Sequence, residues 1–312
     1  MSQAFCVSVG ETRMIEFTIE SSEDGILLDR AIRKRYPELP GSVFYKALRK
    51  KDIRIDGKRI GQIVSLSAGS VVTAYITVPK PLTYEVVYEN DWIFLCRKPQ
   101  GLLSEPDGQG ESSVLEQVQA AYPSYALCHR LDRNTGGLLF LCKQPAYTQA
   151  ISDCLADRYY QKIYRAVVLG DIRKLISAKE NFTLYEAHHF KDSRNKRVYV
   201  YGAPRKGTKP IRTAIRFVSY DGEKDTSEIE VLLITGRTHQ IRAHMAFLGY
   251  PVAGDGKYGV EAKNRRLGYR YQALWAYCYK PADDYQGARR IIDQPIEQVL
   301  PAQTFLCPPE FR

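Results

Sequence analysis

The sequence of 312 residues lacks several features that would place it in a class at once. No stretch of about 18 apolar residues is present, which excludes a membrane-spanning helix. The start, MSQAFCVSVGETRMIEF, has neither the basic residues nor the long apolar run of a secretory signal. The seven cysteines include no C-x-x-C pair, so zinc-site spacing is absent. These absences predict a cytoplasmic protein with buried free thiols and no metal.

The composition is that of a globular protein, with 44% hydrophobic and 26% charged residues. Its length suits one large domain and one small domain. The net charge is +10, and it is concentrated: eleven Lys or Arg residues but only three acidic residues lie between Arg30 and Arg59. Such a cluster is typical of polyanion binding, but a solvated surface would explain the charge alone equally well.

Residues 1–80 are predicted to form the small domain, with a loose leader at 1–14 and an ordered core at 15–80. Apolar spacing predicts a helix over 26–35 and a second helix from a Ser42 cap to about residue 51. The Asp56-Gly57 turn predicts a hairpin over 53–60, and a strand follows at 71–78. The second helix turns four cations outward, Lys46, Arg49, Lys50 and Lys51. A proline linker at 79–81 leads to the large domain.

Residues 82–312 are predicted to form an α+β domain. Strands are expected at 84–88, 92–97, 137–142, 163–169, 197–201, 211–219 and 228–235, and helices at 112–121, 145–157 and 238–248. Thr238 is expected to cap the last helix, which Gly249 ends. Because the strands do not alternate regularly with helices, a mixed, mainly antiparallel sheet is favoured over a doubly wound one.

Three segments concentrate polar residues at the ends of apolar strands. In the first, 128–137, Asp132 lies between two arginines, which would keep a carboxylate ionised as a nucleophile or base. An ordinary surface loop with ion pairs explains this segment equally well. In the second, 236–244, Arg237 and Arg242 flank a strand-to-helix junction that favours an anion. The third, 161–165, contains Tyr164, which by default would be a core aromatic.

The combination of these segments resembles the RluA-type family of RNA pseudouridine synthases. The family's catalytic loop, His-Arg-Leu-Asp followed after two residues by Thr-Ser-Gly-Leu-Leu, corresponds to residues 129–139, with Gly136 in place of serine. Its Lys-x-Tyr corresponds to 162–164, and Gly-Arg-Thr-His-Gln-Ile-Arg-x-His is unbroken over 236–244. Arg97-Lys98-Pro99-Gln100-Gly101-Leu102 matches its opening motif. Leu-Trp-Ala at 274–276 departs from the usual Leu-His-Ala. The resemblance covers residues 82 to 280.

This resemblance implies an isomerase that needs no cofactor, on a pseudouridine-synthase-like sheet. The target uridine must leave its stack to reach Asp132, the implied nucleophile. Tyr164 would stack on the base and help to move a proton, Arg130 would fill the gap in the RNA, and Arg242 would pair with Asp132, with Arg237 as a second choice. The remaining residues implied to bind substrate are His129, Thr238, His239 and Gln240.

Residues 15–80 resemble the small αL, or S-four-like, RNA-binding module, which implies an RNA partner held through phosphates. Large-subunit ribosomal RNA is favoured and transfer RNA is second; a monomer is the default. Two alternatives stay open. A non-catalytic RNA-binding protein would have retained the fold, and a glycosylase would need a second carboxylate to activate water.

Overall fold

The computed structural model describes residues 11–37, 39, 41–78, 83–157, 159–176, 181–282 and 290–311. The chain divides into two compact units, one up to Pro81 and one from Leu82 onward. The predicted linker at 79–81 lies outside the described residues. Within the described ranges, no helix is long and apolar enough to cross a membrane.

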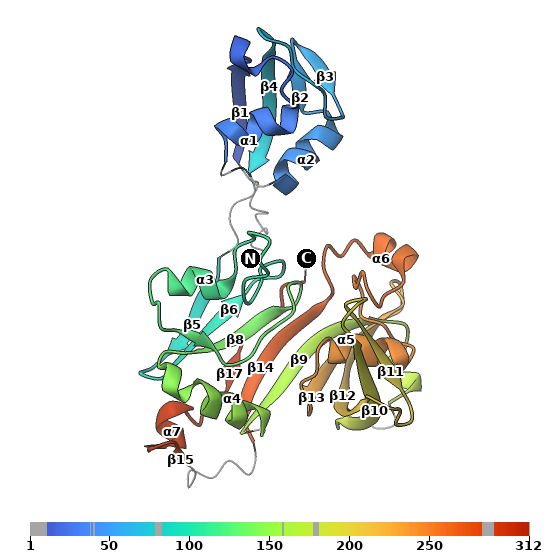
Figure 1. The fold of residues 1–312 in the computed structure, drawn as a ribbon. Coiled ribbons are helices and arrows are strands. Elements are labelled where there is room, and N and C mark those ends of the chain that lie inside the picture. Colours follow the sequence, from blue (N-terminus) through green and yellow to red (C-terminus); the bar gives the residue numbers. More distant parts are fainter. Residues whose placement is uncertain are drawn as a thin grey trace, which may run out of the picture. The chain divides into compact units, whose positions relative to one another are not determined.

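The smaller unit is an antiparallel four-stranded sheet in the order β1-β4-β2-β3, with two helices packed on it (Figure 1). The strands are β1 (Glu11–Thr18), β2 (Ile53–Ile55), β3 (Lys58–Ile60) and β4 (Val71–Val78). The predicted hairpin at 53–60 is confirmed, since β2 pairs with β3 around Asp56 and Gly57, which both have positive φ. The prediction of a loose leader is wrong for residues 11–14, because residues 11–18 pair along the whole of β4, and its residues 1–10 lie outside the described residues.

The two helices of this unit, α1 (Leu28–Arg35) and α2 (Gly41–Lys50), carry an apolar face on the sheet side. In α2, Val43, Phe44, Ala47 and Leu48 are buried, as their spacing predicts. The predicted cap is wrong in position, because α2 begins at Gly41 and Ser42 lies inside the helix. The helix ends at Lys50, where Lys51 takes the left-handed conformation with φ 57°.

The larger unit is built on a single long sheet in the order β11-β10-β12-β13-β9-β14-β8-β6-β5, with β7 and β17 added beside β8 and β14. Among the paired strands described, β8 and β14 are parallel and the other neighbours are antiparallel, which confirms the predicted mixed, mainly antiparallel sheet. The strands are β5 (Glu85–Glu89), β6 (Ile93–Lys98), β7 (Ala126–Leu127), β8 (Gly136–Cys142), β9 (Tyr160–Leu169), β10 (Thr183–Asp192), β11 (Arg197–Tyr201), β12 (Lys209–Asp221), β13 (Thr226–Leu233), β14 (Leu274–Pro281) and β17 (Phe305–Leu306).

Helices cover this sheet in separate groups along its length (Figure 1). They are α3 (Val114–Gln119), α4 (Thr148–Ala156), α5 (Gln240–Phe247), α6 (Glu261–Leu267) and α7 (Ile296–Val299), and a short ribbon of β15 (Arg290–Ile291) and β16 (Gln294–Pro295) precedes α7. Alternate residues of β8 enter two different cores: Leu139 and Leu141 pack with α3 and α5, and Leu138 and Phe140 pack with α4 and α7. Strand β8 is therefore buried on both faces, which explains its unbroken apolar sequence.

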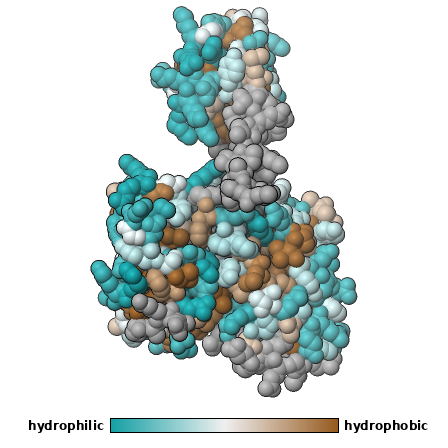
Figure 2. All heavy atoms as spheres, turned by 180° about the vertical axis from the view of Figure 1, so that it is seen from behind, coloured by the Kyte–Doolittle hydropathy of each residue, from teal (hydrophilic) through white to brown (hydrophobic). Residues whose placement is uncertain are grey.

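Several elements were missed by the sequence-based prediction, notably β10, β14 and α6. Figure 2 shows mostly hydrophilic residues on one face of the smaller unit and apolar patches on the same face of the larger unit. Scattered apolar residues are normal on a protein surface. Charge and concave sites are therefore the better guides to function.

Candidate active site

The three polar segments of the sequence meet at one pocket in the larger unit. The pocket has a volume of about 430 Å³, and Asp132, Tyr164 and Arg242 all line it. They come from the loop before β8, from β9 and from α5, which lie far apart in the sequence. The antiparallel pairing of β13 with β9 brings the second segment, which follows β13, next to the third segment at the start of β9. The parallel pairing of β14 with β8 brings the first segment, which precedes β8, to the same end of these strands.

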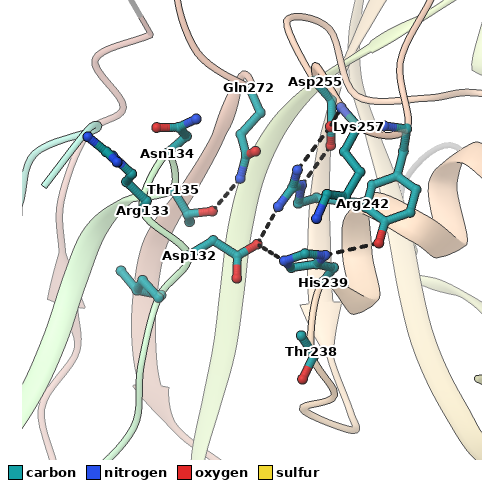
Figure 3. A network of polar contacts seen from close by, with 12 residues as sticks. Asp132, Arg133, Asn134, Thr135, Thr238, His239, Arg242, Asp255, Lys257 and Gln272 are labelled. Atoms are coloured by element: carbon teal, nitrogen blue, oxygen red, sulfur yellow. Dashed lines mark hydrogen bonds and ion pairs between the residues drawn. The ribbon is translucent and has the colours of Figure 1, made fainter. Parts of the chain in front are cut away.

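Asp132 is held by a guanidinium that it shares with a second carboxylate (Figure 3). Nη1 of Arg242 donates to Oδ2 of Asp132 at 2.7 Å, while its Nε and Nη2 donate to the two oxygens of Asp255 at 2.7 and 3.0 Å. Burial raises the pKa of Asp255, but the hydrogen bonds and the charge of Arg242, together with the backbone amides of Lys257 and Tyr258, outweigh burial and hold that pKa below its usual value. The buried carboxylate in turn fixes the orientation of Arg242 toward Asp132.

The other oxygen of Asp132 is available to a substrate. Among the described residues, no hydrogen bond to Oδ1 occurs, and the side chain is 25% exposed toward the pocket. His239 Nε2 lies 3.8 Å from Oδ2, on the same side as Arg242. A carboxylate with one oxygen held by a guanidinium and the other open to a cavity has the geometry that a nucleophile needs.

The loop that carries Asp132 is fixed from below by a buried lysine. Lys98 is fully buried, and its Nζ donates to the carbonyl oxygens of Pro99, Leu102 and Arg133 at 3.1, 2.7 and 3.0 Å. Burial lowers the pKa of Lys98 to about 7, and the negative charge of Asp132 opposes that shift. Since Arg133 directly follows Asp132, the ammonium group sets where the loop lies against β6.

Two glycines let the same loop pass close to β14. Gly137 has φ 108°, and a Cβ there would lie 2.2 Å from the carbonyl oxygen of Ala276. Gly136 has the indole of Trp275 directly against it, and a Cβ there would lie 2.1 Å from Cζ3 of that ring. Gln272 Nε2 donates to the Thr135 hydroxyl at 2.8 Å and completes the attachment. Any side chain at either glycine would force the loop or β14 to move.

His129 and Tyr164 line the pocket from its buried side. Nε2 of His129 accepts a hydrogen bond from the Phe140 amide at 3.1 Å, and burial lowers the pKa of His129 to about 3, so the ring is neutral. Burial also raises the pKa of Tyr164 above its usual value, with Asp132 adding to the shift, so the phenol keeps its proton. A protonated phenol beside Asp132 can donate a proton or stack on a base.

Comparison with known proteins identifies the architecture of this pocket. The family model for RNA pseudouridylate synthases matches residues 92–247, which is half of the chain and includes the Asp132 loop, Tyr164 and Arg242. The chain belongs to this family. The activity of the chain is therefore RNA pseudouridine synthesis, an isomerisation.

Curated relatives of this synthase cover most of its length. The ribosomal large subunit pseudouridine synthase C of Vibrio parahaemolyticus is 26% identical over 90% of this chain and 94% of its own. The protein of the same name from Escherichia coli is 27% identical over 80% of this chain and 81% of its own. The solved structure of human RNA pseudouridylate synthase domain containing 1 has a TM-score of 0.54 and 22% identity, and it covers 67% of this chain and 82% of that one, which supports the fold.

The arginines next to Asp132 in the synthase do not hold it, contrary to the prediction from sequence. Arg130 forms an ion pair with Glu105, and Arg133 forms one with Glu111. The side chain of Arg130 is 70% exposed at the pocket rim, where it can reach RNA. The charge partner of Asp132 is Arg242, 110 residues away in the sequence, and this is the pairing that the family resemblance implied.

The 236–244 segment divides into exposed and internal residues. Arg237 and Thr238 are exposed at the pocket, whereas Gln240 is buried and all its hydrogen-bonding positions are used inside the protein. Its Oε1 accepts from Thr235 and the Arg237 amide, and its Nε2 donates to Arg212 and Thr213. These contacts give Gln240 a structural role; because Gln240 also lines the pocket, its contact with substrate stays a prediction. The predicted Thr238 cap is also wrong, because His239 takes the N-cap position with φ 50°.

Asp255, Tyr258 and Lys98 were missed as site residues. Asp255 and Tyr258 lie in Gly-Asp-Gly-Lys-Tyr-Gly at 254–259, a segment that matched the family without a role being assigned. The Tyr258 hydroxyl accepts from the Val198 amide at 2.9 Å and lies 2.9 Å from His239 Nδ1. A carboxylate among three glycines, with a tyrosine close by, was the available signal. In the described part of the chain, no three His, Cys, Asp or Glu side chains gather as a metal site.

The four cations of α2 belong to the smaller unit. Lys46, Arg49, Lys50 and the following Lys51 are exposed. No ion pair involves them in the described ranges, so they present positive charge to solvent on one side of the helix.

Proposed function

We propose that the chain converts specific uridines of large-subunit ribosomal RNA to pseudouridine, with Asp132 as the nucleophile. The observation that carries the catalytic part is the Asp132 carboxylate, with one oxygen on Arg242 and the other open to the pocket. The choice of ribosomal RNA is supported by the relatives, which are named ribosomal large subunit pseudouridine synthases and align over most of both chains. Transfer RNA is the second candidate substrate.

The reaction breaks the bond between ribose and a uracil nitrogen, turns the base and joins its carbon 5 to the same sugar carbon. Asp132 attacks either the anomeric carbon of the sugar or carbon 6 of the uracil; both routes use one carboxylate and regenerate it. Carbon 5 loses a proton and the freed ring nitrogen gains one, so atoms and charge balance without a further reactant. Tyr164 stacks on the base and lies where it can assist the transfer from carbon 5.

The remaining residues act on the RNA around the target base. Arg130 fills the gap left by the flipped uridine, and Arg237, Thr238 and His239 contact the nucleotide at the pocket rim. Lys46, Arg49, Lys50 and Lys51 on the S-four-like unit bind phosphates and position the RNA. The enzyme acts as a monomer, which light scattering of the purified protein at working concentration tests.

A base-releasing glycosylase is the less favoured alternative. It would need a second carboxylate to activate water. The nearby Asp255 is 1% exposed and both of its oxygens are bound by Arg242, so it has no room for a water. Detection of free uracil after incubation with RNA would favour the glycosylase over the isomerase.

The decisive experiment is a pseudouridine map of cellular RNA from cells with the intact gene and from cells with Asp132→Asn. We expect loss of one or a few sites in large-subunit ribosomal RNA. Removal of the nucleophile lowers turnover by on the order of 10⁴-fold or more, while RNA binding survives because many residues contact phosphates. Loss of sites only from transfer RNA would make transfer RNA the substrate, and an unchanged map would contradict the role of Asp132.

A further inference from the structure

A second cavity adjoins the pocket of Asp132 and has no role in the mechanism described so far. Its volume is about 380 Å³, and Lys191, Thr238 and His239 line both cavities. The His239 residue lines both cavities, with its Nε2 3.8 Å from Oδ2 of Asp132 and its Nδ1 2.9 Å from the Tyr258 hydroxyl. The volume lies within the range of about 300–1,000 Å³ typical of ligand sites. A ligand in one cavity is therefore a direct neighbour of a ligand in the other.

The lining of this cavity is strongly positive. Lys191, Lys196, Arg197 and Lys257 line it, and no Asp or Glu does. In the described part of the chain, none of these four cations takes part in an ion pair. The cavity also opens beside the first turn of α5, whose partial positive charge has the same sign. This concentration of uncompensated charge favours an anionic ligand.

Internal contacts hold these cations together in the absence of a ligand. Lys257 Nζ donates to the carbonyl oxygen of Lys196, and the Arg197 guanidinium lies 5.4 Å from the centre of the Tyr258 ring. The Tyr258 hydroxyl in turn accepts from the Val198 amide. The turn between β10 and β11 is thereby attached to the segment that carries Asp255. Burial and the nearby Arg242 lower the pKa of Lys257, as expected where cations crowd together.

We propose that this basic cavity, the Lys196 subsite, binds the RNA backbone phosphate next to the target uridine. The proposal rests on the proposed function, since it takes the uridine to occupy the pocket of Asp132. A nucleotide whose base enters that pocket brings its two flanking phosphates to the rim, and the wall formed by Thr238 and His239 leads from the rim into the subsite. A phosphate fixed there sets the depth and angle of the base without reading sequence.

The test measures affinity against salt for the full-length protein and a seven-nucleotide RNA with one central uridine among cytidines. Lys196→Gln should lower the slope of log affinity against log salt by about 0.7, the share of one phosphate contact on a single strand. Lys191→Gln should do the same. Lys224→Gln is the matched control, because it lies at the turn between β12 and β13, at the opposite end of these strands from Thr213, which contacts Gln240.

Two further RNAs identify which backbone phosphate contacts the Lys196 subsite. Each carries one neutral methylphosphonate linkage, on the 5′ or on the 3′ side of the uridine. We expect that at one of these positions wild type and Lys196→Gln acquire the same slope. The proposal is overturned by equal slopes on the unmodified RNA, by a difference that neither linkage removes, or by an absence of salt-dependent binding. Competition by inorganic phosphate that Lys196→Gln abolishes, without any effect of either linkage, would assign the subsite to free anions and also overturn it. Because only binding is measured, this result is independent of the Asp132→Asn map.

Discussion

Two sets of cations in this synthase differ in how they are held. On α2 of the smaller unit, Lys46, Arg49 and Lys50 are exposed side by side and use no internal partner among the described residues. In the larger unit, Arg242 is buried and divided between Asp132 and Asp255. Exposed cations add independent and interchangeable contributions to polyanion binding. A buried cation between two carboxylates cannot be replaced, because its loss leaves buried charge unpaired.

The same substitution in both regions gives the largest expected contrast. Arg242→Met should lower the free energy of unfolding by about 3–5 kcal/mol, because Asp255 stays buried without its partner. Turnover should also fall by at least about 100-fold, since Asp132 loses its only guanidinium contact among the described residues. Arg49→Met should change the free energy of unfolding by less than about 0.5 kcal/mol. Urea unfolding measures the change in stability, and single-turnover assays measure the change in rate. Similar effects for the two variants would contradict the difference between the buried and the exposed cations.

The packing of Gly136 against Trp275, beneath the Asp132 loop, links the two departures from the family pattern. Gly136 replaces the usual serine and Trp275 the usual histidine, and the two residues are in contact. Gly136→Ser should destabilise the protein by about 1–3 kcal/mol, because its Cβ meets the indole. The same change in a Trp275→His background should cost less. A double-mutant cycle by urea unfolding measures this coupling, and additive effects would show that the two departures are independent.

Among the described residues of the smaller unit, cations are paired internally at one place, and this place responds to pH. Arg35 and Lys34 donate to Glu23, and these hydrogen bonds lower the pKa of Glu23 to about 2 from a usual 4.5. Since the folded pKa is the lower one, the stabilisation is complete above pH 4.5 and is lost as the pH falls toward 2. Glu23→Gln should remove this acid sensitivity. Amide exchange of residues 28–35 between pH 5 and 3 measures it, and the same acid sensitivity in the variant would exclude Glu23 as its cause.

The smallest effect is expected for a single cation of α2. Lys50→Gln should lower the slope of log affinity against log salt by about 0.7–0.9 for ribosomal RNA fragments. Turnover of RNA that is already bound should not change, because Lys50 takes no part in the pocket of Asp132. The measurement is a salt titration of binding beside single-turnover rates. A change in the single-turnover rate would show that α2 affects the catalytic step as well as RNA binding.

The sequence predicted much of the smaller unit correctly because its structure is local. The hairpin at 53–60, the strand at 71–78 and the inward face of α2 follow from turn residues and apolar spacing over a few positions. Strand β1 was missed, since its place is decided by pairing with β4, some 60 residues later in the sequence. An edge strand with exposed alternate residues shows little local signal.

In the larger unit, the motifs could be found in the sequence, but of the contacts between them only the pair of Arg242 with Asp132 was implied, through the family resemblance. Asp132, Tyr164 and Arg242 were singled out from their motifs, and the pocket that contains all three exists only because β8, β14, β9 and β13 lie side by side. Charge along the sequence suggested Arg130 and Arg133 as partners of Asp132 because they are its neighbours, whereas the family resemblance implied Arg242, and the Arg242 pair is the one observed. The fold turned them toward Glu105 and Glu111 instead.

The sequence by itself determined the family, the class of reaction and the type of sheet, because these depend on residue identities at short spacings. Only the tertiary structure decided the further contacts of these motifs. It placed Asp255 behind Arg242, paired the side-chain amide of Gln240 inside the protein, and put Trp275 against Gly136. Electrostatic and packing interactions act over a few ångströms in space, and sequence separation does not record that distance.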